Sequence, residues 1–132
     1  MNDTAKPAAP ANLPTEAELE ILNILWASGP GTVRDVHTRI SKGVGYTTVL
    51  KQMQLMVEKG LLSRTEEHRS HVYAPRIAKQ QTQRRLARNL LQRAFDGSAR
   101  DLVLGALSAQ KVSAKELAEI RRLLDDYEKG RV

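Results

Sequence analysis

The sequence predicts a mainly α protein, with a winged helix-turn-helix followed by a helical module. Two short helical patterns meet at a glycine-containing turn at residues 41–45, which is the helix-turn-helix arrangement. The later helix of this pair, the third in the chain, ends at Gly60 and leads directly into two short strand patterns, the order in which a winged helix places its wing. After the strands, only helical patterns with leucine-rich faces follow. We therefore expect a flexible tail at residues 1–12, a winged-helix domain at 13–76 and a helical dimerisation domain at 77–132.

Capping patterns open the first two helices. Thr15 with Glu18, and Thr32 with Asp35, have the spacing at which a side chain and a backbone N–H satisfy each other at a helix start. Between them, the Ser-Gly-Pro-Gly run at residues 28–31 ends the first helix. Apolar residues at helical spacing predict the buried sides of these helices: Leu19, Leu22, Leu25 and Trp26 in the first, and Val33, Val36 and Ile40 in the second.

The third helix, expected at residues 46–59, has two faces with different chemistry. Its apolar stripe predicts the buried side: Val49, Leu50, Met53, Met56 and Val57. The opposite side carries small hydroxyls, an amide and a lysine, which hydrogen-bond base edges and phosphates without filling the major groove. We expect DNA contacts from this side: Tyr46, Thr47, Thr48, Lys51 and Gln54. For Tyr46, a phosphate contact through its hydroxyl and a packing role at the helix start remain equal alternatives.

A basic hairpin is expected directly after the third helix. Residues 62–66 and 71–74 have strand patterns, and residues 67–70 form the connecting turn. Arg69 lies in this turn, where a wing presents positive charge to the sugar-phosphate backbone, so we expect it to contact DNA. The alternative for Arg69 is a surface charge that serves solubility.

The helical patterns after residue 76 predict a dimerisation module. Three helices in about 50 residues bury too little apolar surface to be stable alone. The chain has no cysteine for disulfides, and a second copy is the simplest source of the missing apolar contact. The residues expected in the dimer contact are Leu86, Leu90, Leu102, Leu107, Leu117, Ile120 and Leu124. A ligand pocket between these leucine stripes is the less common alternative.

The charge distribution is uneven along the chain. The formal net charge is +6, but residues 1–77 carry nine Lys and Arg against eight Asp and Glu, while residues 78–132 carry twelve against seven. The expected DNA-reading part is therefore nearly neutral, and overall basicity is weak support for a DNA partner.

Other classes of function find little support in the sequence. It contains none of the common nucleophile, phosphate-loop, dinucleotide or zinc-protease motifs, so we expect neither enzymatic activity nor a cofactor. His68 and His71 lack carboxylate or thiolate partners at useful spacing, so no metal site is expected. No apolar run is long enough to span a bilayer and no secretory signal is visible, so we expect a cytoplasmic protein without membrane insertion.

The chain resembles the penicillinase repressor family over residues 13–126. Five stretches carry the resemblance: residues 18–26, 46–49, 58–62, 101–104 and 119–124. The resemblance implies a homodimeric repressor that blocks a promoter until a signal removes it. It also implies, as a further partner, a membrane sensor protease or another signalling protein.

Two departures from the family limit what the resemblance implies. In the β-lactam-responsive branch an Asn-Phe pair is cleaved, and the matching pair here is Gly105-Ala106, which argues against proteolytic induction at this bond. The copper-responsive branch uses C-terminal cysteines, and this chain has none. The sequence thus predicts a sequence-specific DNA-binding repressor, a homodimer on a palindromic double-stranded operator. The alternative is a winged-helix module that binds other proteins and never touches DNA.

Overall fold

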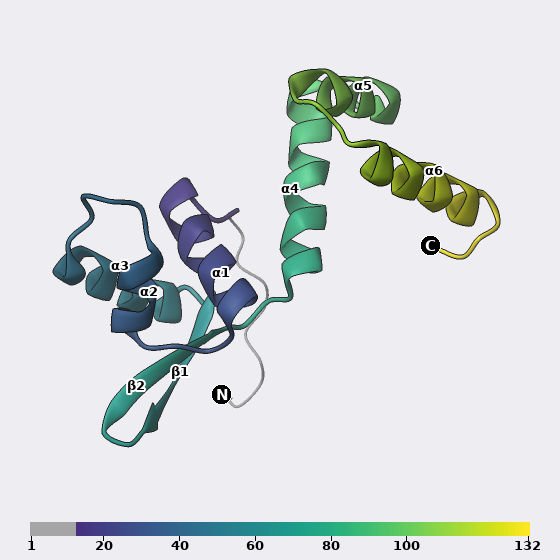
Figure 1. Cartoon of the computed structure of the whole chain (residues 1–132). Helices are drawn as coiled ribbons and strands as arrows, with labels where there is room; N and C mark the ends of the chain where they lie inside the picture. The colour runs from purple at the N-terminus through teal and green to yellow at the C-terminus, as the bar shows by residue number, and fades with distance from the viewer. Residues whose placement is uncertain (1–12) are drawn as a thin grey trace, which may run out of the picture. The chain divides into compact units, whose positions relative to one another are not determined.

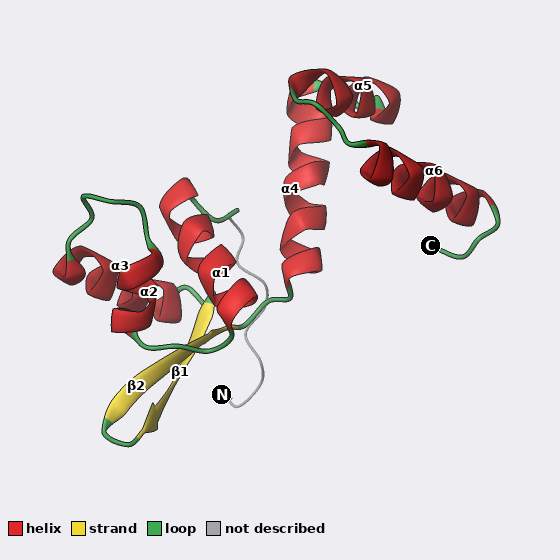
Figure 2. Ribbon diagram, in the orientation of Figure 1, coloured by secondary structure: helices red, strands yellow, loops and turns green. Residues whose placement is uncertain are grey.

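The computed structural model describes residues 13–132, and the expected tail at residues 1–12 lies outside them (Figure 1). In this range helices and one antiparallel hairpin follow in the order α1 (Glu16–Ser28), α2 (Val33–Arg39), α3 (Tyr46–Glu58), β1 (Leu62–Glu67), β2 (Ser70–Pro75), α4 (Lys79–Ala94), α5 (Ala99–Ala109) and α6 (Ala114–Glu128). The mainly helical content, with a single hairpin between α3 and α4, confirms the predicted fold class (Figure 2).

The contacts along the chain gather into two compact units, one that ends at Ala87 and one that runs Arg88–Val132. The domain boundary expected after residue 76 stays a prediction. One contact of the first unit nevertheless extends past that point, because the indole Nε1 of Trp26 donates a hydrogen bond of 3.1 Å to the carbonyl of Ile77. Ile77 also packs against the core, and Thr82 in α4 is buried. The packing of the winged helix therefore uses residues beyond 76.

The first unit is held together by a small aliphatic core between α1, α2, α3 and the hairpin. On α3, Val49, Met53 and Met56 are fully buried, which confirms the apolar stripe expected on that helix. Burial of each such side chain contributes about 1.5–3 kcal/mol. The other fully packed members come from the neighbouring elements: Ile21, Leu22, Leu25, Val33, Val36, Leu61, Leu62 and Tyr73. This core fixes which side of α3 faces outward.

The hairpin is attached to the helices through its second strand. Gly31, in the link between α1 and α2, forms a backbone bridge with Tyr73, with N···O distances of 3.0 and 2.8 Å. Within the hairpin β1 and β2 pair from Leu62 opposite Pro75 to Glu67 opposite Ser70. The strands thus extend one residue further toward the turn than the sequence pattern indicated, and only His68 and Arg69 remain in the loop.

The capping boxes predicted for the first two helices are present, and the first one also holds an ion pair, whereas the box expected at Ser113 and Glu116 is only a one-way cap. The Thr15 hydroxyl accepts from the Glu18 N–H while the Glu18 carboxylate accepts from the Thr15 N–H, and Thr32 and Asp35 do the same for α2. The buried Glu18 carboxylate also lies 2.7 Å from Nζ of Lys59, just after α3. Sequence spacing identified the cap but not this pair, because 41 residues separate the partners.

The stability of the first unit should depend on the ionisation of Glu18. Burial by itself would raise the pKa of this carboxyl, but hydrogen bonds from Lys59 and Thr15 and the charge of Lys59 hold the pKa below its ordinary value of 4.5. A carboxyl whose pKa is lower in the folded state stabilises the fold above its unfolded-state pKa, and the contribution is lost as the pH falls through the folded-state pKa.

We therefore expect Glu18→Gln to lower the free energy of unfolding by about 1–2 kcal/mol at neutral pH. The difference from the wild type should shrink as the pH falls from about 4.5 through the lower folded-state pKa, because the wild-type carboxyl becomes protonated and neutral like the amide. Urea denaturation at several pH values measures this difference. A gap that stays constant down to about pH 3 would show that Glu18 ionisation does not stabilise the fold.

The helices of the second unit are well capped but poorly buried. The hydroxyls of Ser98 and Ser113 accept from backbone N–H groups three residues further on, at 3.1 and 3.0 Å. Neither α5 nor α6 has a fully buried residue. Large apolar side chains are exposed instead: Leu90, Val103, Leu104, Leu107, Leu123, Leu124 and Tyr127. In the described residues no helix is long and apolar enough to cross a membrane.

Candidate nucleic-acid interface

The outward side of α3 carries the residues that the sequence predicted to contact DNA. Thr47, Thr48, Lys51 and Gln54 are all exposed, and Leu55 beside them is exposed as well. The start of α3 is also open, because its N-cap is Gly45 and no side chain caps it, unlike α1 and α2. Free N–H groups at a helix start favour a negatively charged neighbour. The helix thus presents hydroxyls, an amide and an ammonium group on one solvent-facing surface.

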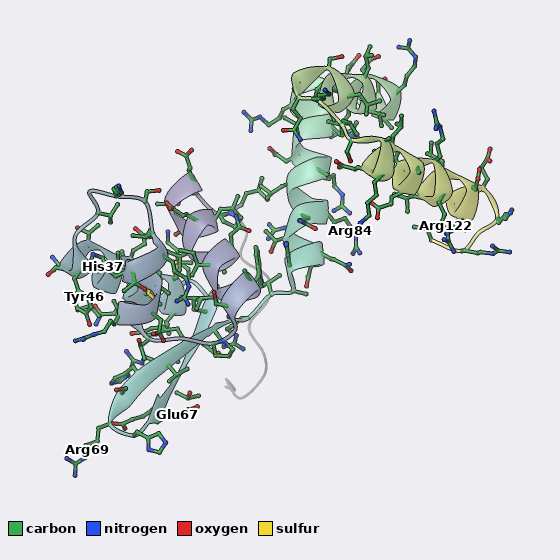
Figure 3. The ribbon with its side chains drawn as sticks, in the orientation of Figure 1. His37, Tyr46, Glu67, Arg69, Arg84 and Arg122 are labelled. Atoms are coloured by element: carbon green, nitrogen blue, oxygen red, sulfur yellow. The ribbon has the colours of Figure 1, made fainter. Side chains whose placement is uncertain are left out.

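Tyr46, at the start of this surface, packs against His37 of α2. The rings of His37 and Tyr46 meet edge to face, with centroids 5.8 Å apart (Figure 3). Nε2 of His37 also lies 2.9 Å from the carbonyl oxygen of Val44, in the turn before α3. Tyr46 remains 46% exposed, so it packs against His37 and still has a large solvent-accessible surface. A lone histidine in a short helix gave no signal of this contact.

A groove lies between α3 and the wing, with a volume of about 450 Å³. We call it the α3–wing groove and define it by its lining residues: Thr32, Val33, Arg34, Tyr46, Leu50, Gln54, Arg64, Ser70, His71 and Tyr73. Gln54 and Tyr46 belong both to this groove and to the expected DNA-contacting side of α3. No role was predicted for Arg34, another lining residue, because it is a single basic residue between the buried positions Val33 and Val36 of α2.

The wing tip places Arg69 at the outer end of the hairpin, pointing away from the helices (Figure 3). The two loop residues, His68 and Arg69, have φ values of 49° and 65°. Positive φ at both central positions of a two-residue hairpin loop is the geometry that Asn-Gly adopts most easily, and it is strained for larger residues. The chain therefore holds a histidine and an arginine at its tip at a cost in stability.

Replacing the tip with His68→Asn and Arg69→Gly should raise the free energy of unfolding by about 1–2 kcal/mol, because the strain is relieved. The same double variant should bind DNA more weakly, since the Arg69 charge is lost. His68→Asn alone, which keeps Arg69, should gain part of the stability without this loss of binding. Thermal denaturation and DNA titration measure the two effects. A tip variant that is no more stable than the wild type would contradict the strain argument.

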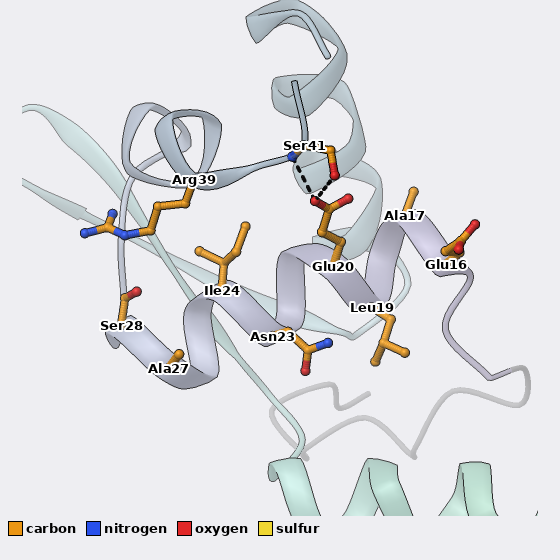
Figure 4. Close-up of a pocket in the computed structure, with 10 residues that line it drawn as sticks. All are labelled: Glu16, Ala17, Leu19, Glu20, Asn23, Ile24, Ala27, Ser28, Arg39 and Ser41. Carbon is orange, nitrogen blue, oxygen red and sulfur yellow. Dashed lines mark hydrogen bonds between the residues drawn. The ribbon is translucent and has the colours of Figure 1, made fainter. Parts of the chain in front are cut away.

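A second, larger groove of about 840 Å³ runs along the outer side of α1 (Figure 4). Its main polar contact is structural: Glu20 accepts from the N–H and the hydroxyl of Ser41, at 2.8 and 2.5 Å. This contact holds the turn before α3 against α1. None of the residues expected to bind DNA lines this groove.

The residues expected in the dimer contact divide by exposure. Leu86, Leu102, Leu117 and Ile120 are half-buried, whereas Leu90, Leu107 and Leu124 are 46%, 38% and 57% exposed. Their role in dimerisation stays a prediction. Among residues 13–132, no group of three or more His, Asp or Glu side chains could hold a metal ion.

Comparison with known proteins points to one family. The sequence matches the family model described as penicillinase repressor over residues 14–126. It is 30% identical over 118 residues to the transcriptional regulator BlaI of Mycobacterium tuberculosis, covering 87% of this chain and 85% of that protein. It is 24% identical over 115 residues to the penicillinase repressor of Bacillus licheniformis, covering 86% and 90%. The methicillin resistance regulatory protein MecI of Staphylococcus aureus is 21% identical over 115 residues, covering 84% and 92%.

Proposed function

The chain belongs to the penicillinase repressor family of transcriptional repressors, and on that premise we propose that it represses transcription as a homodimer bound to a palindromic DNA operator. The observation that carries the proposal is the exposed polar side of α3 beside the wing. Tyr46, Thr47, Thr48, Lys51 and Gln54 supply base and phosphate contacts, and Arg69 supplies a backbone contact at the wing tip.

Dimerisation is supported by the apolar surface of the second unit. Exposed side chains such as Leu104, Leu124 and Tyr127 are 54%, 57% and 69% accessible in the single chain. Many large apolar side chains exposed on one small unit favour a contact with another protein. A second copy is the partner that also serves the function, because a two-fold dimer presents two α3 helices to two half-sites of a palindrome.

A repressor acts where its promoter is, so we place the protein in the cytoplasm. We assign it no enzymatic activity. A signalling protein such as a membrane sensor protease remains the class of partner that ends repression. Cleavage inside α5 is not part of the proposal. Gly105-Ala106 replaces the Asn-Phe pair of the β-lactam-responsive branch, and Gly105 packs against the ring of Phe95.

A DNA titration tests the proposal against the alternative of a protein-binding winged helix. The probe is a duplex that the full-length protein selects from a random-sequence pool, compared with a scrambled duplex of the same composition. A repressor should enrich one palindromic sequence, and its affinity should fall by about 10³–10⁵ between 50 and 200 mM salt if six to ten phosphates are contacted. No enrichment, or binding that ignores salt, would favour the protein-binding alternative.

A further inference from the structure

The α3–wing groove contains two arginines that come from different elements. Arg34 is the second residue of α2, and Arg64 lies in the middle of β1, where it pairs in register with Tyr73. Both arginines line the groove together with the hydroxyl-bearing Tyr46 and Ser70. No aspartate or glutamate is among the lining residues. The groove thus gathers guanidinium and hydroxyl donors without a carboxylate to neutralise them.

Neither guanidinium has an ion-pair partner in the described part of the chain, where the ion pairs join Lys59 to Glu18, Arg100 to Asp101 and Arg131 to Asp126. Three acids do belong to the same elements. The Asp35 carboxylate is occupied by the cap of α2, where it accepts from the Thr32 N–H at 2.9 Å. In the hairpin register Glu66 stands opposite His71 and Glu67 opposite Ser70, and neither glutamate lines the groove.

The groove continues into the DNA-contacting side of α3. Gln54 lines the groove and belongs to that side, and Tyr46 lines it at the first turn of the helix. A ligand whose base edges contact Thr47 and Lys51 therefore also reaches the groove with a neighbouring segment. Planar guanidinium groups recognise phosphate through two parallel hydrogen bonds. An occupant that offers base edges to α3 and phosphates to the adjoining groove is a strand of duplex DNA.

We propose that the α3–wing groove is a phosphate-binding cleft that holds one strand of the operator backbone through Arg34 and Arg64. This inference rests on the proposed function and assigns affinity and sequence recognition to different residues. The groove supplies sequence-independent affinity and salt dependence, while Thr47, Thr48 and Lys51 read the sequence. This assignment also explains how a nearly neutral domain can bind DNA. Two unpaired arginines in one groove supply local positive charge, although the net charge of residues 1–77 is close to zero.

The test removes both charges from the full-length protein with Arg34→Gln and Arg64→Gln. A matched control removes two exposed charges from the second unit with Lys111→Gln and Lys115→Gln. Each variant is titrated with the selected duplex and with the scrambled duplex across a range of salt concentrations. A further variant with Arg34→Lys and Arg64→Lys keeps the charge but loses the bidentate fork. Circular dichroism melting confirms that every variant is folded, which is expected because both arginines are exposed.

We expect the double glutamine variant to bind both duplexes about 10–100-fold more weakly, with the ratio between them unchanged. The slope of log affinity against log salt should decrease in magnitude by about 1.8, the value for two lost phosphate contacts. The double lysine variant should keep the wild-type slope, and the control should keep both slope and affinity.

Three outcomes would overturn the inference. The double glutamine variant could keep the wild-type slope and affinity, it could lose only the preference for the selected duplex, or the control could lose as much affinity as the double glutamine variant. A wild-type protein that binds neither duplex would instead remove the proposed function itself, so the two failures are distinguishable.

Discussion

Leu124→Asp in α6 is expected to convert the protein from a dimer to a monomer and to lower its operator affinity by about 10²–10⁴-fold. Leu124 is 57% exposed in the single chain, so an aspartate there costs the isolated protomer little. In a dimer the same carboxylate would be buried without a partner, which opposes association. Loss of the second reading head then removes the gain from binding two half-sites at once.

The matched control for this prediction is Ala118→Asp, which adds the same charge to the same helix. Ala118 is exposed, and helical spacing places it about 100° around α6 from Leu117 and about 120° from Leu124, off the apolar stripe. This variant should remain dimeric and bind the operator as the wild type does. Light scattering gives the mass, and titration of the selected duplex gives the affinity. A Leu124→Asp protein that is still dimeric would place the dimer contact elsewhere.

Lys51→Ala should lower operator affinity by about 1–3 kcal/mol, which is roughly 5–150-fold. Lys51 lies on the exposed side of α3 and has no ion-pair partner among the described residues, so its charge is available to a ligand. Alanine is the better helix former, so the free energy of unfolding should not fall. Lys115→Ala, at an exposed position of α6, is the control for the loss of one charge.

The pattern of the loss identifies what Lys51 contacts. If Lys51 binds a guanine edge, affinity for the selected duplex falls while affinity for the scrambled duplex is kept. If it binds phosphate, both fall together and the salt slope decreases by about 1. Unchanged affinity for both duplexes would show that the exposed side of α3 does not face DNA.

The sequence was most informative where neighbours along the chain determine the outcome. Helical spacing predicted that Val49, Met53 and Met56 would be buried and that Thr47, Thr48 and Lys51 would be exposed, and both sides of α3 are as expected. These predictions succeed because the helical period is set by the backbone, so a short stretch of sequence contains the information. The boxes at Thr15 and Thr32 are local in the same way, since each cap joins residues three apart.

The sequence was least informative about contacts between separate elements of the chain. Three such features join different elements: the ring contact of Tyr46 with His37, the ion pair of Lys59 with Glu18, and the placement of Arg34 and Arg64 along one groove. No local period connects such residues. Their proximity follows from how the helices and the hairpin pack around the core.

The sequence by itself determined the order of the elements, the outward side of α3 and the family to which the chain belongs. These depend on periodic burial and on capping, which act over a few residues. Only the tertiary structure decided that a groove beside α3 gathers Arg34 and Arg64, and that the wing tip holds His68 and Arg69 in a strained turn. The physical reason is that burial of the apolar core brings separate elements together. Charged side chains from those elements, such as Arg34 and Arg64, then lie along the same groove.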